Sequence, residues 1–188
     1  LADKLRSFLP NIVASEVLAA RAGLKVARTG LKQAKAIRLM QLGREAGFYV
    51  LVGEQECFPR RDKGKGGWCN GSKEGKVGES GYFNSYVGKS ARIATQARDA
   101  EMAGDDDTFA QFLGTPECCR NFYDRVKYEA ALEQNDFFPF SAPRSPAQPA
   151  NALLTLGSQN FDASLIIHFP CSLSCKRSIC VARSVARL

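Results

Sequence analysis

The sequence predicts a mainly helical α+β domain over residues 1–188, with a small sheet and one long glycine-rich loop. A length of 188 residues with 45% hydrophobic residues suits a single compact domain. Long proline-free stretches carry apolar residues at steps of three and four, which indicates helices. Two short apolar runs have the composition of buried strands. A mostly α fold is the alternative.

The first predicted helix covers about residues 15–44 and lies in a basic segment that extends over residues 1–47. Its apolar residues recur at helical spacing, as at Leu24, Leu31 and Ile37. A second face carries five cations, with no carboxylate between Glu16 and Glu45. We expect this face to bind an anion, and a solvated helix face is the alternative. The five predicted anion-binding residues are Arg21, Lys25, Arg28, Lys32 and Lys35.

A strand and a long loop are predicted next. Gly47 is a plausible helix stop, and the apolar run that follows it predicts a buried strand over about residues 48–53. Residues 54–81 form the loop, with seven glycines between Gly64 and Gly81 and interleaved lysines. We expect this loop to act as a mobile lid over a substrate, because so many glycines cannot hold one conformation without outside contacts. Its substrate-contacting residues would be Trp68, Cys69 and Asn70.

Local signals predict the remaining elements. The clearest is Thr115-Pro116-Glu117, which combines a helix N-cap, a first-turn proline and a first-turn acid. The small sheet is predicted to pair the strand at about 48–53 with a second strand at about 164–169. The other predicted elements are helices over about 87–103, 108–113, 115–134 and 174–188, and a proline-rich linker over 141–150.

Two groups of cysteines occupy similar places in this scheme. Cys118 and Cys119 open the helix after Pro116, and Cys171 and Cys175 flank the start of the last helix. Free N–H groups and the helix dipole stabilise a thiolate, which is both a nucleophile and a metal ligand. If the two helix starts converge, these four cysteines and His168 would surround one centre. The ligand count suits zinc or an iron–sulfur cluster, although the spacing matches neither standard motif.

Two other interpretations of these residues stay open. Cys118 or Cys119 would be a catalytic nucleophile with His168 as its base, by analogy with known Cys/His sites. Alternatively, the cysteines are small buried residues at tight helix starts, since free cysteine is among the residue types most often buried. Ser172 and Ser178 would support either kind of site from outside the reacting groups.

The strings Gly114-Thr-Pro-Glu-Cys-Cys119 and His168-Phe-Pro-Cys-Ser-Leu-Ser-Cys175-Lys-Arg-Ser178 carry a resemblance. The chain resembles a set of uncharacterised microbial proteins with paired G-x-P-x-C-C and H-x-P-C-S-x-x-C-x-x-S motifs. The resemblance covers roughly residues 40–188 and implies that both strings form one site, without naming a reaction.

Composition limits the function classes. Seven cysteines, an odd number, with no evident export signal favour reduced thiols and a cytoplasmic location. A net charge of +7 favours an anionic partner. The leading prediction is a thiolate-dependent enzyme, metal-assisted or covalent, that acts on a small anionic substrate. The alternative function is that of a basic module that binds RNA or an acidic partner and holds a structural zinc ion. We expect no membrane partner. The metal, the reaction and the oligomeric state stay open.

Overall fold

The computed structural model describes residues 1–58, 81–132, 138–144, 165–166 and 168–188. It confirms the predicted class, a mainly helical α+β protein with a small antiparallel sheet. The chain divides into two compact units, which we describe one at a time: unit 1 comprises Leu1–Pro59 and Asn70–Gly114, and unit 2 comprises Arg60–Cys69 and Thr115–Leu188. That residues 1–188 fold as one domain stays a prediction. In the described ranges, no helix has both the length and the apolar character needed to cross a bilayer.

Unit 1 is built on three antiparallel strands. They are β1 (Ala27–Leu31), β2 (Tyr49–Cys57) and β3 (Tyr82–Gly88), in the order β1-β3-β2. The register pairs Val50 with Val87 and Leu51 with Tyr86. Because side chains alternate along a strand, the two valines face one side of the sheet while Leu51 and Tyr86 face the other.

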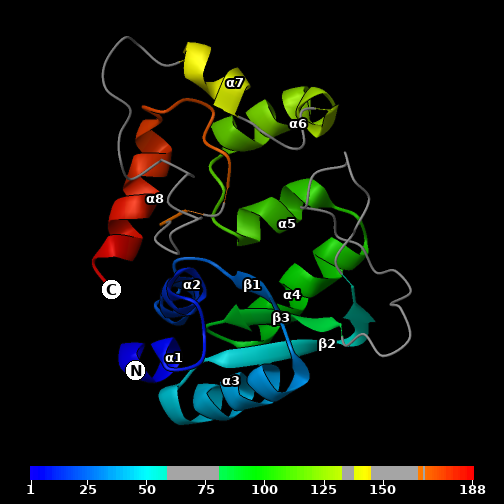
Figure 1. Ribbon diagram of the computed structural model, residues 1–188, viewed down its shortest axis with the longest axis vertical. Helices are drawn as coiled ribbons and strands as arrows, with labels where there is room; N and C mark the ends of the chain where they lie inside the picture. The colour runs from blue at the N-terminus through cyan, green and yellow to red at the C-terminus, as the bar shows by residue number, and fades with distance from the viewer. Residues whose placement is uncertain (59–80, 133–137, 145–164, 167) are drawn as a thin grey trace. The chain divides into compact units, whose positions relative to one another are not determined.

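Each face of this sheet has its own apolar layer. Val50 and Val87 belong to a cluster with residues of α1, α2 and α3, whereas Leu51 and Tyr86 pack with residues of α4 and α5. Figure 1 shows α3 beside β2 and α4 on the other side of the strands. The helices are α1 (Ala2–Arg6), α2 (Asn11–Arg21), α3 (Gln33–Ala46), α4 (Ala91–Met102) and α5 (Asp106–Phe112).

The prediction of one helix over residues 15–44 is wrong. The chain forms α2, then β1, then α3 over this range. Gly23 follows α2 with a φ of 79°, a left-handed conformation that favours glycine. Gly30 lies under the Tyr82 ring, and a Cβ there would approach this ring to 2.5 Å. Pairing with β3 therefore outweighs the helical periodicity, which is a local signal only.

The basic helix face does not exist either. Two of its cations are committed to ion pairs within unit 1: Lys25 pairs with Glu16 in the interior, and Arg28 reaches Glu101 on α4 at 2.8 Å. The five predicted anion-binding residues are spread over several elements of unit 1. They are Arg21 in α2, Lys25 in the turn after α2, Arg28 in β1, Lys32 directly before α3 and Lys35 in α3. The helical arrangement on which that prediction rested is therefore absent.

The sheet was predicted only in part. Strand β2 confirms the run at 48–53, but Leu165, Ile166, His168 and Phe169 are not in a strand. The strand that pairs with β2 is β3, where the sequence analysis began a helix at Val87. The helix itself is confirmed from Ala91 onward as α4. The proposed lid lies outside the described residues for the most part, and so do Trp68, Cys69 and Asn70.

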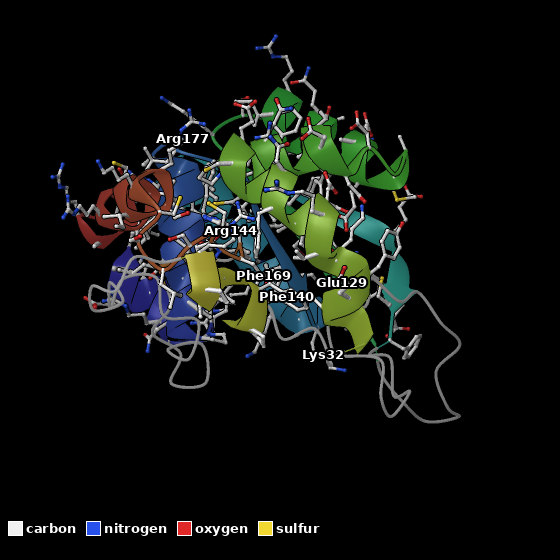
Figure 2. All side chains as sticks on the ribbon, turned by 90° about the horizontal axis from the view of Figure 1, so that it is seen from above. Lys32, Glu129, Phe140, Arg144, Phe169 and Arg177 are labelled. Atoms are coloured by element: carbon white, nitrogen blue, oxygen red, sulfur yellow. The ribbon has the colours of Figure 1, made fainter. Side chains whose placement is uncertain are left out.

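Unit 2 contains the two helices that carry the cysteines. Helix α6 (Glu117–Leu132) confirms the predicted helix after Pro116, and α8 (Lys176–Ala186) confirms the C-terminal one. Between them lie α7 (Phe138–Ser141) and the short helix η1 (Ala142–Arg144), which take up the start of the predicted linker. Phe140 and Phe169 pack against buried Phe122, and Figure 2 shows these two outer rings together.

Candidate metal centre

Four sulfur atoms of unit 2 come together. Cys118 and Cys119 lie in the first turn of α6, Cys175 is the N-cap residue of α8, and Cys171 lies four residues earlier. Their Sγ atoms all lie within 4.8 Å of one another, which makes them a group able to hold a metal ion. The predicted convergence of the two helix starts is therefore confirmed.

The separations among three of the sulfurs fit a tetrahedron. The Sγ of Cys175 lies 3.7 Å from that of Cys118 and 3.8 Å from that of Cys119, and the two adjacent cysteines are 3.9 Å apart. A tetrahedral zinc site with Zn–S bonds of about 2.3 Å places its sulfurs about 3.8 Å apart. The four thiols are free of disulfides, so all of them are available as ligands.

The four cysteines differ in exposure. Cys119 is fully buried and Cys175 is 9% exposed, whereas Cys118 and Cys171 are half-buried. Apolar neighbours such as Ile166 and Ala182 enclose the buried pair. The centre therefore has one dry side and one side accessible to small molecules.

Burial and hydrogen bonding separate the acidities of these thiols. Burial raises the pKa of Cys119 far above its usual value, and raises that of Cys171 to about 11 together with the charges of its sulfur neighbours. Burial also opposes the ionisation of Cys175, but hydrogen bonding by Ser178 and by neighbouring thiols outweighs it and lowers the pKa to about 7. Cys175 is thus the most acidic of these three thiols, while a bound metal would deprotonate its thiol ligands.

His168 lies behind the sulfurs, not among them. Its Nε2 is 2.8 Å from the Oγ of Ser178, and this hydroxyl is 3.2 Å from the Sγ of Cys119. Both residues are buried. Ser178 therefore links the imidazole to the cluster, and its supporting role stays a prediction. The roles of His168 as metal ligand or catalytic base stay predictions.

The remaining predicted residues have other surroundings. The Oγ of Ser172 lies 2.9 Å from that of Ser174 and accepts a hydrogen bond from the backbone N–H of Ser174, and these contacts stabilise the turn before α8. Cys180 is exposed on α8, and Cys57 is buried at the end of β2 in unit 1. Neither of these two cysteines belongs to the four-sulfur group.

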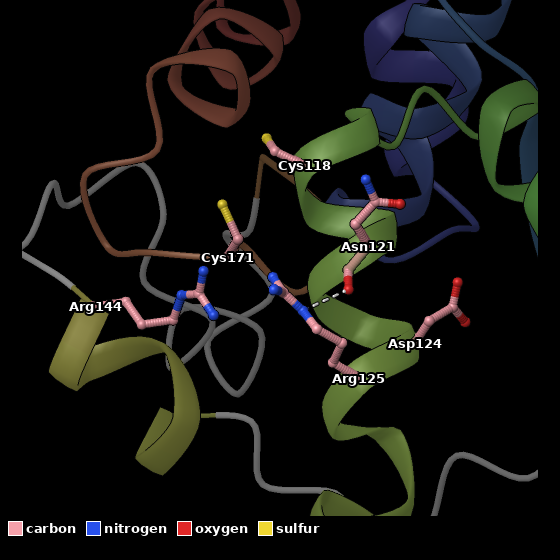
Figure 3. Close-up of a pocket in the computed structure, with 6 residues that line it drawn as sticks. All are labelled: Cys118, Asn121, Asp124, Arg125, Arg144 and Cys171. Carbon is pink, nitrogen blue, oxygen red and sulfur yellow. Dashed lines mark hydrogen bonds between the residues drawn. The ribbon is translucent and has the colours of Figure 1, made fainter.

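The exposed side of the cluster opens into a cavity that the sequence analysis missed. Cys118 and Cys171 line it together with four polar residues of α6 and η1, and its volume is about 500 Å³ (Figure 3). A signal for it was present, because residues i, i+3 and i+7 share one face of a helix, which is the spacing of Cys118, Asn121 and Arg125. The polar lining residues are Asn121, Asp124, Arg125 and Arg144.

No protein-family model, curated protein or solved structure matches the chain.

Proposed function

We propose that unit 2 is a zinc-binding module in which Cys118, Cys119, Cys171 and Cys175 hold one Zn²⁺ ion. The observation that supports this most is the set of S–S separations of 3.7 to 3.9 Å among three of the sulfurs. Four thiolates around a single ion are the ligand set of tetrahedral structural zinc sites.

A mononuclear ion fits this geometry better than an iron–sulfur cluster does. In a cluster, each thiolate binds its own iron or shares one iron with a second thiolate, and inorganic sulfides lie between the irons. Such a core needs more room than four sulfurs within 4.8 Å of one another leave. A single tetrahedral iron would fit as well as zinc, so elemental analysis is part of the test.

The ion would connect parts of unit 2 that are otherwise joined by a small core. Its ligands come from the start of α6, from the segment before α8 and from the N-cap of α8. Apart from the cysteines, the fully buried members of the apolar cluster around the sulfurs are Ile166 and Ala182. Metal binding would therefore supply folding free energy to this unit, as it does in other small zinc modules.

Metal analysis of freshly purified protein tests this proposal. We expect one zinc per chain in the full-length protein and in Cys180→Ser, which removes an exposed cysteine of α8 outside the cluster. Cys119→Ser and Cys175→Ser should each lose most of the zinc, because a hydroxyl is a poor replacement for a thiolate ligand. Bound iron with a broad visible absorbance would indicate an iron–sulfur cluster instead of zinc. Protein without bound metal would overturn the proposal.

A thiol enzyme is the second candidate, since Cys175 has a pKa lowered to about 7. Against it, the residues that line the cavity are Cys118 and Cys171 instead of Cys175. Alkylation of metal-free protein by iodoacetamide, mapped by mass spectrometry, separates the two. Rapid labelling of Cys175 near neutral pH in protein purified without metal supports the thiol enzyme. Protection of all four cysteines by bound zinc supports the metal module.

A further inference from the structure

The cavity beside the cluster has a charge arrangement that the metal proposal does not use. Arg125 of α6 and Arg144 of η1 line it from two different elements, and Figure 3 shows their guanidinium groups pointing toward one another. Among the described residues, no carboxylate forms an ion pair with either of them. Two like charges that converge without a counterion repel each other, and an anion between them would remove this cost.

Both guanidiniums are held by contacts that leave donors available. The Nε of Arg125 donates to the carbonyl oxygen of Asn121 at 3.1 Å. The guanidinium of Arg144 lies over the ring of Phe122, 5.5 Å from its centroid. A guanidinium has five N–H groups, so each arginine keeps most of them for a ligand.

The one acid among the described residues that line the cavity does not pair with either arginine. Asp124 forms an ion pair with Lys127 at 2.9 Å, and in Figure 3 its carboxylate points away from the two arginines. Asn121 adds an uncharged amide to the lining. The cavity thus offers two positive charges and an amide, and its volume of about 500 Å³ lies in the range of small-molecule sites.

From these observations we infer that the cavity is a binding site for a small oxyanion, with a phosphate group of a small ester as the ligand class. A phosphate dianion matches two guanidiniums in charge, and each guanidinium can donate two parallel hydrogen bonds to it. The bound group would lie beside Cys118 and Cys171. This inference goes beyond the metal proposal, because neither arginine is among the proposed ligands.

A second role for the arginines must be separated from this one. Four thiolates on one Zn²⁺ carry a net charge of −2, and two nearby guanidiniums would compensate it. In that case, neutralising an arginine would weaken zinc binding. In the anion site, the same change would weaken phosphate binding and leave the zinc content unchanged.

Calorimetric titration of the full-length protein, with zinc measured on the same samples, tests the inference. The probes are inorganic phosphate, glycerol phosphate and succinate. We expect glycerol phosphate to bind best. Arg125→Gln and Arg144→Gln should each weaken its binding about tenfold or more, since each removes a charge-assisted hydrogen bond. Arg183→Gln, which changes an exposed arginine of α8, is the matched control. Arg125→Lys and Arg144→Lys keep the charge without the forked donors and should give intermediate losses.

The outcomes separate the two proposals. Phosphate binding that survives both glutamine variants, or no binding of any probe at millimolar concentration, overturns the anion site. Loss of zinc in these variants assigns the arginines to charge compensation and also overturns it. Phosphate binding by protein that contains no zinc would keep the anion site and reject the metal module. If succinate bound more tightly than glycerol phosphate, the ligand class would be a carboxylate and not a phosphate ester.

Discussion

The two units differ in the size of the apolar clusters in their interiors. Unit 1 buries large aliphatic and aromatic residues on both faces of its sheet, for example Leu39, Phe48 and Val87 in the layer formed with α3. In unit 2, the cluster around the sulfurs buries Cys119, Cys175, Ala182 and Ile166, with Leu165, Ile179 and Val181 partly buried against it, and a second small cluster surrounds buried Phe122. Since each buried large apolar side chain contributes about 1.5–3 kcal/mol, unit 1 gains more stability from apolar burial than the sulfur cluster of unit 2 does. The comparison leads us to expect that unit 2 depends on the proposed metal cross-link.

Removal of the metal should produce the largest difference between the units. We expect a strong chelator to expose the backbone of α8 and of the first turn of α6 to hydrogen exchange, while β3 stays protected. Zinc binding contributes about 10–16 kcal/mol in zinc-finger peptides, which is comparable to the whole free energy of unfolding of a typical domain, about 5–15 kcal/mol. Hydrogen exchange with mass spectrometry, with and without chelator, measures this. Unchanged protection of α8 in demonstrably metal-free protein would contradict the comparison.

Lys25→Met should destabilise unit 1 by about 3–5 kcal/mol, because it leaves buried Glu16 without its counterion. Burial raises the pKa of Glu16 and the lysine opposes this. A raised folded-state pKa stabilises the fold at low pH, and this contribution is lost as pH rises through the folded-state value. The variant should therefore be more stable at about pH 5 than at about pH 8.

Urea unfolding at the two pH values checks this prediction. The matched control is the double variant Glu16→Leu with Lys25→Met, which removes both charges and should recover most of the lost stability. A single variant whose stability rises with pH would contradict the proposed cause.

Leu39→Ala should cost unit 1 about 2–5 kcal/mol, since this side chain is fully buried in the layer between α3 and the sheet. Ile37→Ala on the same helix is the control, because Ile37 is 48% exposed and its loss should change stability by only about 0.5 kcal/mol. Denaturant unfolding measures both. Zinc content should stay the same in both variants. A loss of zinc from Leu39→Ala would show that destabilising unit 1 also affects the metal site of unit 2.

Ser178→Ala should have the smallest effect, a loss of about 1–3 kcal/mol in unit 2. The change removes the hydroxyl that contacts Cys119 and His168, and leaves these buried groups without that hydrogen bond. Ser184→Ala is the control on the same helix, because its hydroxyl is exposed and bonds only to the carbonyl of Cys180. Unfolding monitored by hydrogen exchange of α8 compares the two, and equal losses would contradict a special role for Ser178.

The sequence predicted features that depend on neighbouring residues better than those that depend on distant ones. The helix after Pro116 has its start signals within a few residues, and α6 begins at Glu117. Lys25 and Arg28 were assigned to an exposed helix face because their partners Glu16 and Glu101 cannot be deduced from spacing. Glu101 lies 73 residues from Arg28. Long-range pairing also determines β1, where the helical pattern was misleading.

The same distinction holds for the candidate site. The cysteines were found because two helix starts carry the same residue type, and their convergence is confirmed. Arg144 was missed because η1 comes close to α6 only in the folded unit. Arg125 was within reach of the sequence, since it repeats the helical spacing of Cys118.

The proposed ion would also change the topology of the chain. Cys119 and Cys175 are 56 residues apart, so a metal bound by both closes a loop through α6, α7 and η1. A protease that cuts the chain between Arg144 and Leu165 would then release no fragment, because the ion still holds the two pieces of unit 2 together. Adding a chelator to the nicked protein would separate them, and the separation would be visible as a change in mass under native conditions.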